Sequence, residues 1–250
     1  MILRKDYVHR SCLKKGDFVM NYEYDPGMYP QSQPITLGQY TGRTFLWMVL
    51  GLMITFGVAI ASWLTGIVLL AYQFHLVILI ATLILSVTMA ARIEKMSVGG
   101  AIGIFVAFSA LFGLTMSIYL VLFDLASMVL VFLMTALYFV ALAVYGHFTQ
   151  ADLSGLRTIL FSGLIFLIIF GILSMFIPGL DAFDRIVCII GIAVFLGYTA
   201  YDTQRIRDFY YYYSGYPDML EKASIFSALQ LYLDFLNLFI YLLRFMGKRR

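Results

Sequence analysis

Apolar residues fill most of this chain in long runs, each about the length of a helix that crosses a bilayer, with short polar links between them. A hydrocarbon core of about 30 Å needs roughly 20 largely apolar residues per helical span. The pattern predicts an all-α integral membrane protein with seven transmembrane helices, at Thr44–Trp63, Phe74–Ala91, Gly99–Phe123, Leu125–Val144, Ile159–Ile177, Ile186–Tyr201 and Ile225–Phe245. Only 12% of the 250 residues are charged, against about 25% in soluble domains. A soluble globular domain is therefore excluded.

The beginning of the chain has a different character. Residues 1–43 mix charged residues with Pro26, Pro30 and Pro34 and show no sustained apolar period, which is typical of an exposed, poorly ordered tail. Because the first long apolar run starts only at Thr44, we expect no cleaved secretory signal. The chain thus divides into an N-terminal tail, residues 1–43, and a transmembrane domain, residues 44–250.

Basic residues sort by link and predict the orientation of the bundle. The tail and the links after the second, fourth and sixth spans carry nearly all of them, whereas the links after the first, third and fifth spans carry only Arg185. The positive-inside rule therefore predicts a cytoplasmic N-terminus. Lys248, Arg249 and Arg250 would then lie outside, unless the seventh run re-enters the membrane instead of crossing it, and we expect crossing. The net charge of +3 follows from these basic links and indicates no nucleic-acid partner.

Several carboxylates stand where helices are expected to begin. Asp124 directly precedes the predicted fourth span, Asp184 stands two residues before the sixth, and Asp218 is followed three residues later by Glu221. These positions predict helix N-caps and a capping box. The cysteines and histidines show no metal-ligand spacing, so we expect neither a bound metal nor a cofactor.

Asp234 is the clearest candidate functional residue, because an ionisable side chain near the middle of a membrane is costly. It lies about 13–14 Å into the last span. It also belongs to a polar stripe at helical spacings of three and four, formed by Ser227, Gln230, Asp234, Asn237 and Tyr241. Such a stripe must face protein or water. It predicts a lined pathway or a proton site, and the alternative is a buried hydrogen-bonded stripe that only fixes packing.

Two further charged residues end spans on the side predicted to be cytoplasmic. Asp202 ends the sixth span, within reach of Asp234 or, alternatively, as a solvated partner of Arg205. Arg92 ends the second span and suits a counter-ion to a carboxylate on another helix, or a membrane anchor that only sets topology.

Three segments resemble the Bax inhibitor-1 family, and the resemblance extends over residues 38–247. They are Gly197-Tyr198-Thr199-Ala200-Tyr201-Asp202-Thr203-Gln204-Arg205-Ile206, Leu231-Tyr232-Leu233-Asp234-Phe235-Leu236-Asn237-Leu238-Phe239 and Ser109-Ala110-Leu111-Phe112-Gly113-Leu114-Thr115. The resemblance implies a bundle whose last helix is central and wrapped by the other six, in the cytoplasmic membrane of a bacterium.

The resemblance also implies a pH-sensitive calcium leak, gated by a hydrogen-bonded pair of aspartates that would here be Asp202 and Asp234. A basic residue at the end of span two exchanges partners with this pair in the family; Arg92 matches it best, with Lys95 as the competitor. An acidic residue that some members carry within span two has no match here. Calcium, a hard cation, suits carboxylate and carbonyl oxygen ligands, and calcium ions, protons and lipid are the expected partners.

Other functions fit the residues less well. An intramembrane aspartyl protease also uses two membrane aspartates, but its second motif requires Gly-x-Gly-Asp, and Leu231-Tyr232-Leu233 precedes Asp234 here. We therefore expect no enzyme. A non-conducting membrane protein that regulates unknown partners through its tail and loops is the remaining alternative.

Overall fold

The computed structural model describes residues 35–174 and 176–249. Within these ranges the chain is helical: α1 (Leu37–Thr65), α2 (Val68–Gln73), α3 (His75–Arg92), α4 (Val98–Leu122), α5 (Leu125–Phe148), α6 (Leu156–Ser174), the short 3₁₀ helix η1 (Leu180–Phe183), α7 (Asp184–Tyr213) and α8 (Pro217–Met246). Seven of these helices, all except α2 and η1, are long and apolar enough to cross a membrane. The predicted all-α bundle of seven spans is confirmed.

The first helix begins at Leu37, before the predicted start at Thr44. The reason is a capping box, in which the hydroxyl of Thr36 accepts from the backbone N–H of Gln39 and the Gln39 side chain accepts from the N–H of Thr36. Of the tail predicted for residues 1–43, residues 1–34 lie outside the described residues. Of the remainder, Ile35 and Thr36 precede α1, and residues 37–43 form its first turns.

The predicted caps have mixed outcomes. Asp124 does cap α5, because its carboxylate accepts from the N–H of Ser127 at 3.2 Å. The other two predictions are wrong: Asp184 is the first residue of α7 and its side chain pairs with Arg244, while α8 already begins at Pro217, which leaves Asp218 inside its first turn. Proline suits a first helical turn because its missing N–H would have no partner there.

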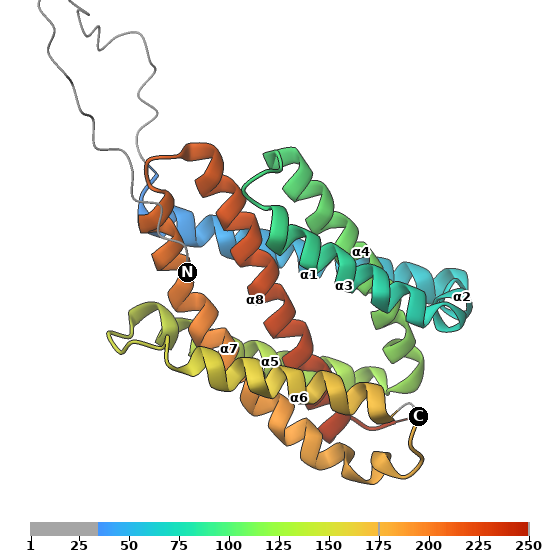
Figure 1. Ribbon diagram of the computed structural model, residues 1–250. Helices are drawn as coiled ribbons and strands as arrows, with labels where there is room; N and C mark the ends of the chain where they lie inside the picture. Colours follow the sequence, from blue (N-terminus) through green and yellow to red (C-terminus); the bar gives the residue numbers. More distant parts are fainter. Residues whose placement is uncertain (1–34, 175, 250) are drawn as a thin grey trace, which may run out of the picture. The chain divides into compact units, whose positions relative to one another are not determined.

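Helix α8 lies at the centre of the bundle and packs against α1, α4, α5 and α7 (Figure 1). Of its most apolar stretch, 67% of the residues are buried, against 11% for α6. Helix α3 packs mainly on α4, and α6 mainly on α7. The expectation of a central last helix is confirmed, but four of the other six spanning helices, rather than all six, supply its main packing.

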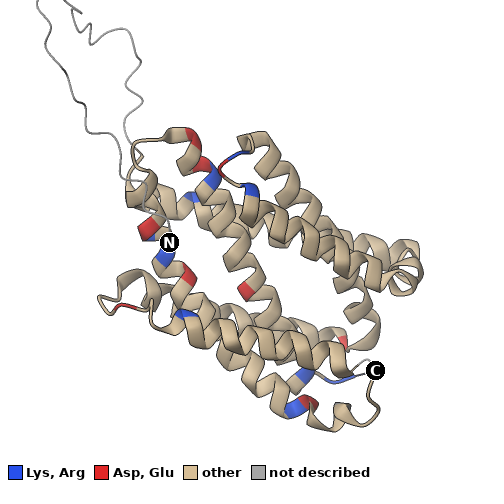
Figure 2. Cartoon of the chain, in the orientation of Figure 1, with Lys and Arg blue, Asp and Glu red and all other residues tan. Residues whose placement is uncertain are grey.

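At 30 residues α8 is continuous and about 45 Å long, which is sufficient to cross a bilayer of about 30 Å in the hydrocarbon region. Charged residues concentrate near the ends of the bundle, most of all at the end where α1 begins, whereas the surfaces of the helices between the ends are almost free of them (Figure 2). This distribution suits seven spans with apolar surfaces facing lipid.

Candidate functional site

The segment of α7 around Asp202 is held by contacts to α5 and to the link between α5 and α6. Gly146 of α5 lies directly against the backbone of Ala200, so that a side chain at this position would collide with the Ala200 carbonyl. Two residues beyond Asp202, Gln204 accepts from the N–H of Leu153 at 3.1 Å and donates to the carbonyl of Ala151 at 2.8 Å. The link between α5 and α6 is thereby tied to α7, which fixes the position of the Asp202 backbone.

Asp234 is positioned by the neighbouring residues of α8, which contact α1 and α5. Two residues earlier, the Tyr232 hydroxyl lies 2.5 Å from the hydroxyl of Thr55 on α1, and the Tyr232 ring is completely buried. Directly after Asp234, the ring of Phe235 packs edge-on against Phe132 and Phe139 of α5, at centroid separations of 5.4 and 5.5 Å. Helix α8 therefore has little freedom to rotate, and Asp234 is directed toward α7.

Asp202 and Asp234, which we call the aspartate pair, meet in the interior of the bundle. Their side chains are 6% and 4% exposed and lie within hydrogen-bonding reach of each other. Asp202 Oδ1 and Asp234 Oδ2 are buried and receive no hydrogen bond from the rest of the described protein. Because ionised carboxylates only accept hydrogen bonds, one proton shared between them would satisfy both oxygens.

A cavity of about 260 Å³ borders the aspartate pair, and we call it the aspartate cavity. Its walls come from α3, α6, α7 and α8, including Ser86 of α3 and Leu164 of α6, the two spanning helices that pack least closely on α8. The amide side chains of Gln230 and Asn237 line it as well. The polar side chains that line the cavity thus carry carboxyl groups, amide groups and the hydroxyls of Ser86 and Tyr198.

A second cavity, of about 600 Å³, lies toward the end of α8 and is lined by Tyr241, Arg244 and Arg249, together with residues of α3 and α4. We call it the arginine cavity. Asn237 lines both cavities, and its amide nitrogen donates to the carbonyl of Leu233 at 2.8 Å. This side chain therefore stands at the boundary between them.

The predicted polar stripe of α8 does not face one space. Gln230, Asp234 and Asn237 line the aspartate cavity, while Tyr241 faces the arginine cavity. Ser227 is buried without lining either cavity. Helical spacing placed these residues on one side of α8, but the neighbouring helices divide that side into separate environments.

Arg92 is not beside the aspartate pair in this structure. It is exposed at the end of α3 and lines a different cavity together with Lys95. Ala90, two residues earlier, does line the aspartate cavity. A contact between Arg92 and the pair would therefore require a different side-chain orientation or a shift of α3.

Arg205 does not form an ion pair with Asp202 among the described residues. Its guanidinium lies over the ring of Phe209 instead, 4.8 Å from the ring centre.

Two charged groups have roles that the sequence did not reveal. Lys222 is 6% exposed, and its ammonium donates to the carbonyls of Glu94 and Met96 in the link between α3 and α4. Asp184 of α7 pairs with Arg244 of α8. Both contacts join residues far apart in the chain, and neither follows a short-range spacing that could have predicted it.

A central helix surrounded by apolar spans, with a carboxyl pair buried between the central helix and one of these spans, defines a multi-pass helical membrane protein with an ionisable site in its core. Comparison with known proteins gives the family. The family model described as "Inhibitor of apoptosis-promoting Bax1" matches residues 37–250. The chain belongs to this family, the Bax inhibitor-1 family, as its motifs had suggested.

Relatives in several bacteria match nearly the whole chain. The inner membrane protein YbhL of Escherichia coli is 36% identical over 89% of this chain and 99% of its own length. A protein of Rickettsia prowazekii is 33% identical over 86% of this chain and 91% of its own. A Deinococcus radiodurans protein is 32% identical over 87% and 95%.

Proposed function

We propose that this protein is a calcium-leak channel of a bacterial cytoplasmic membrane, with its N-terminus in the cytoplasm, and that the aspartate pair gates it in response to pH. The observation that carries the proposal is the pair itself. Two carboxyl groups, contributed by different helices, are buried together against a cavity, and neither forms an ion pair with a basic side chain in the part of the chain that the structure describes.

Protonation gives the pair two arrangements. With one shared proton, a hydrogen bond joins α7 to α8, because one carboxyl can donate to the other. With both groups ionised, like charges in a poorly solvated site repel each other. Losing that proton would therefore weaken one connection between the two most buried helices, and a change of this kind is what a gate between two states requires.

Calcium is a reasonable permeant ion for the groups that line the cavity. It binds six to eight oxygen ligands in flexible geometries, including carboxylates, amide carbonyls and water. Such oxygens are offered by Asp202 of α7 and by Gln230, Asp234 and Asn237 of α8. With one oxygen from each, these four side chains leave about two to four coordination positions to water, which suits an ion in transit.

The conduction path in this proposal runs along α8. It passes from the aspartate cavity past Asn237 into the arginine cavity, which borders the opposite end of the bundle from the start of α1. In this proposal Arg92 forms an ion pair with one of the two aspartates when the pair separates. Lys95 is the competing candidate for this role.

The test is calcium flux through the purified full-length protein in liposomes loaded with a calcium-sensitive dye, measured over a series of pH values. We expect flux above that of protein-free liposomes, with a reversible dependence on pH. Absence of flux at every pH, together with capture of specific protein partners, would instead support a non-conducting regulatory protein. Cleavage of a membrane-spanning substrate would support the protease alternative.

A further inference from the structure

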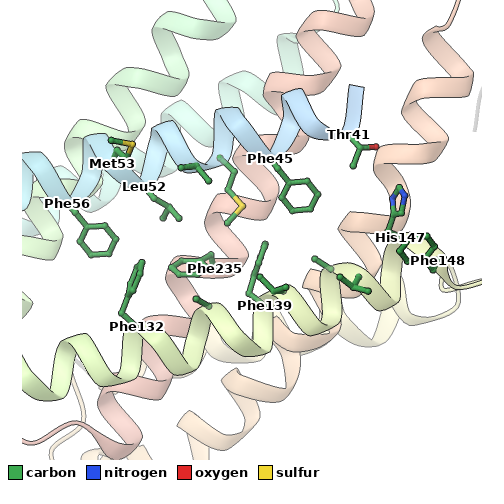
Figure 3. A pocket seen from close by; sticks show the side chains of 16 residues that line it. Thr41, Phe45, Leu52, Met53, Phe56, Phe132, Phe139, His147, Phe148 and Phe235 are labelled. Carbon is green, nitrogen blue, oxygen red and sulfur yellow. The ribbon is translucent and has the colours of Figure 1, made fainter. Parts of the chain in front are cut away.

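A separate groove lies on the other side of α8 from the aspartate cavity, between α1 and α5, and we call it the α1–α5 groove (Figure 3). It has a volume of about 630 Å³. Phe45 and Leu52 of α1 form one wall, Phe139 of α5 forms the facing wall, and Phe235 of α8 forms the floor. The groove shares no lining residue with the aspartate cavity.

One end of the groove is closed. Phe56 of α1 and Phe132 of α5 meet there edge-on, with 5.2 Å between their ring centres. From Phe56 to Thr41 at the other end, the groove follows α1 for about 22 Å. Half of a bilayer's hydrocarbon core is about 15 Å thick. The groove therefore has the length of one leaflet and part of the interface, with its closed end deepest in the membrane.

The open end carries polar groups. Thr41 and His147 line it (Figure 3), and the Thr41 hydroxyl oxygen is buried without a hydrogen-bond partner in the described structure. Beyond the end of α5, the Arg207 guanidinium lies 3.4 Å from the carbonyl of Thr149. Arg207 has no carboxylate within ion-pair distance among the described residues.

These features occur in the order of the parts of a phospholipid. The closed, aromatic-walled groove suits an apolar acyl chain. The hydroxyl of Thr41 can donate to an ester carbonyl, and the remaining N–H donors of Arg207 can bind a phosphate. We propose that the α1–α5 groove binds one acyl chain of a glycerophospholipid, with its ester carbonyl at Thr41 and its phosphate at Arg207. This lipid site is independent of the proposed calcium conduction.

The first test measures phospholipid retained by the full-length protein after purification and washing in a mild detergent. Wild type should keep about one phospholipid per chain. Val140→Trp, on the groove wall, should reduce retention about tenfold at fixed wash volume. Leu137→Trp is the matched control, because Leu137 is 66% exposed on the same helix but does not line the groove. Equal retention in both variants would overturn the groove assignment.

The second test concerns the phosphate and does not depend on filling the groove. Delipidated protein is titrated with phosphatidylglycerol and with diacylglycerol of identical chains, using thermal stability as the readout. Wild type should require about tenfold more diacylglycerol for the same stabilisation, since a charge-assisted contact is lost. Arg207→Gln should remove this preference, and Lys95→Gln should keep it. A wild type that responds equally to both lipids would overturn the assignment of the phosphate to Arg207.

Discussion

Replacing Asp202 or Asp234 by Asn removes one ionisable group and keeps a side chain of nearly the same shape that still forms hydrogen bonds. The two carboxyl groups lie within hydrogen-bonding reach of each other and are 6% and 4% exposed. Either substitution alone therefore abolishes the state in which both groups are charged. We expect each single variant to lose the pH response as completely as the double variant does.

The expected coupling is large enough to be measured. Two unit charges about 3 Å apart, a hydrogen-bond distance, repel by about 5–6 kcal/mol at an effective dielectric constant near 20. Independent sites add to within about 0.3–0.5 kcal/mol. Opening of the site to water would reduce the repulsion, but a coupling of about 1 kcal/mol would still stand well outside that error.

The assay is calcium flux from dye-loaded liposomes across a pH series, for wild type, Asp202→Asn, Asp234→Asn and the double variant. Asp208→Asn is the matched control, since Asp208 is an exposed carboxylate on the same helix as Asp202. We expect the pH-dependent change in flux to fall to about the same residual level in both singles and the double, and to persist in the control. Two separable and additive effects of the single variants would refute the pair, and unchanged profiles in all three variants would refute a gating role.

Three further predictions follow from the bundle. Arg92→Ala should alter the pH dependence of flux while Lys95→Ala leaves it nearly unchanged, and reversed effects would transfer the role of basic partner to Lys95. With native cysteines replaced by serine, Thr65→Cys should react with an impermeant reagent added outside intact cells, whereas Lys95→Cys should react only after permeabilisation; the opposite pattern would invert the topology. Thr65 is preferable to neighbouring Gly66, whose φ of 78° would strain a cysteine. Asp184→Asn should lower the free energy of unfolding by about 1–3 kcal/mol, because it leaves Arg244 without its charged partner. The measurement is thermal unfolding in detergent at neutral pH, with Asp184→Glu as the conservative control. An Asp184→Asn variant as stable as wild type would contradict this prediction.

The sequence by itself determined the number of spanning helices and the buried carboxylates. A bilayer-spanning helix forms all its backbone hydrogen bonds within one segment, so length and apolar content were sufficient to identify α1 and α3 to α8. The cost of charge in an apolar environment likewise singled out Asp234 without any knowledge of its neighbours. The family motifs added Asp202 as its partner.

Helix boundaries were harder to predict from the sequence, because they depend on single polar side chains and on the contacts that these side chains make in the folded protein. Asp124 forms the cap that its position indicated. Asp184 stands in the same kind of position but pairs with Arg244 instead. The choice between a local cap and a distant partner is made by the fold.

Only the tertiary structure decided what each side of a helix faces. The stripe on α8 is continuous in sequence, yet Ser227 is buried away from both cavities, Asn237 lies between the two cavities, and Tyr241 faces the arginine cavity. The α1–α5 groove is equally hidden in the sequence, since Phe45, Phe139 and Phe235 belong to three apolar helices that read as ordinary spans. Helical periodicity fixes which residues share a face of one helix, whereas the neighbour of that face depends on how all seven spans pack together.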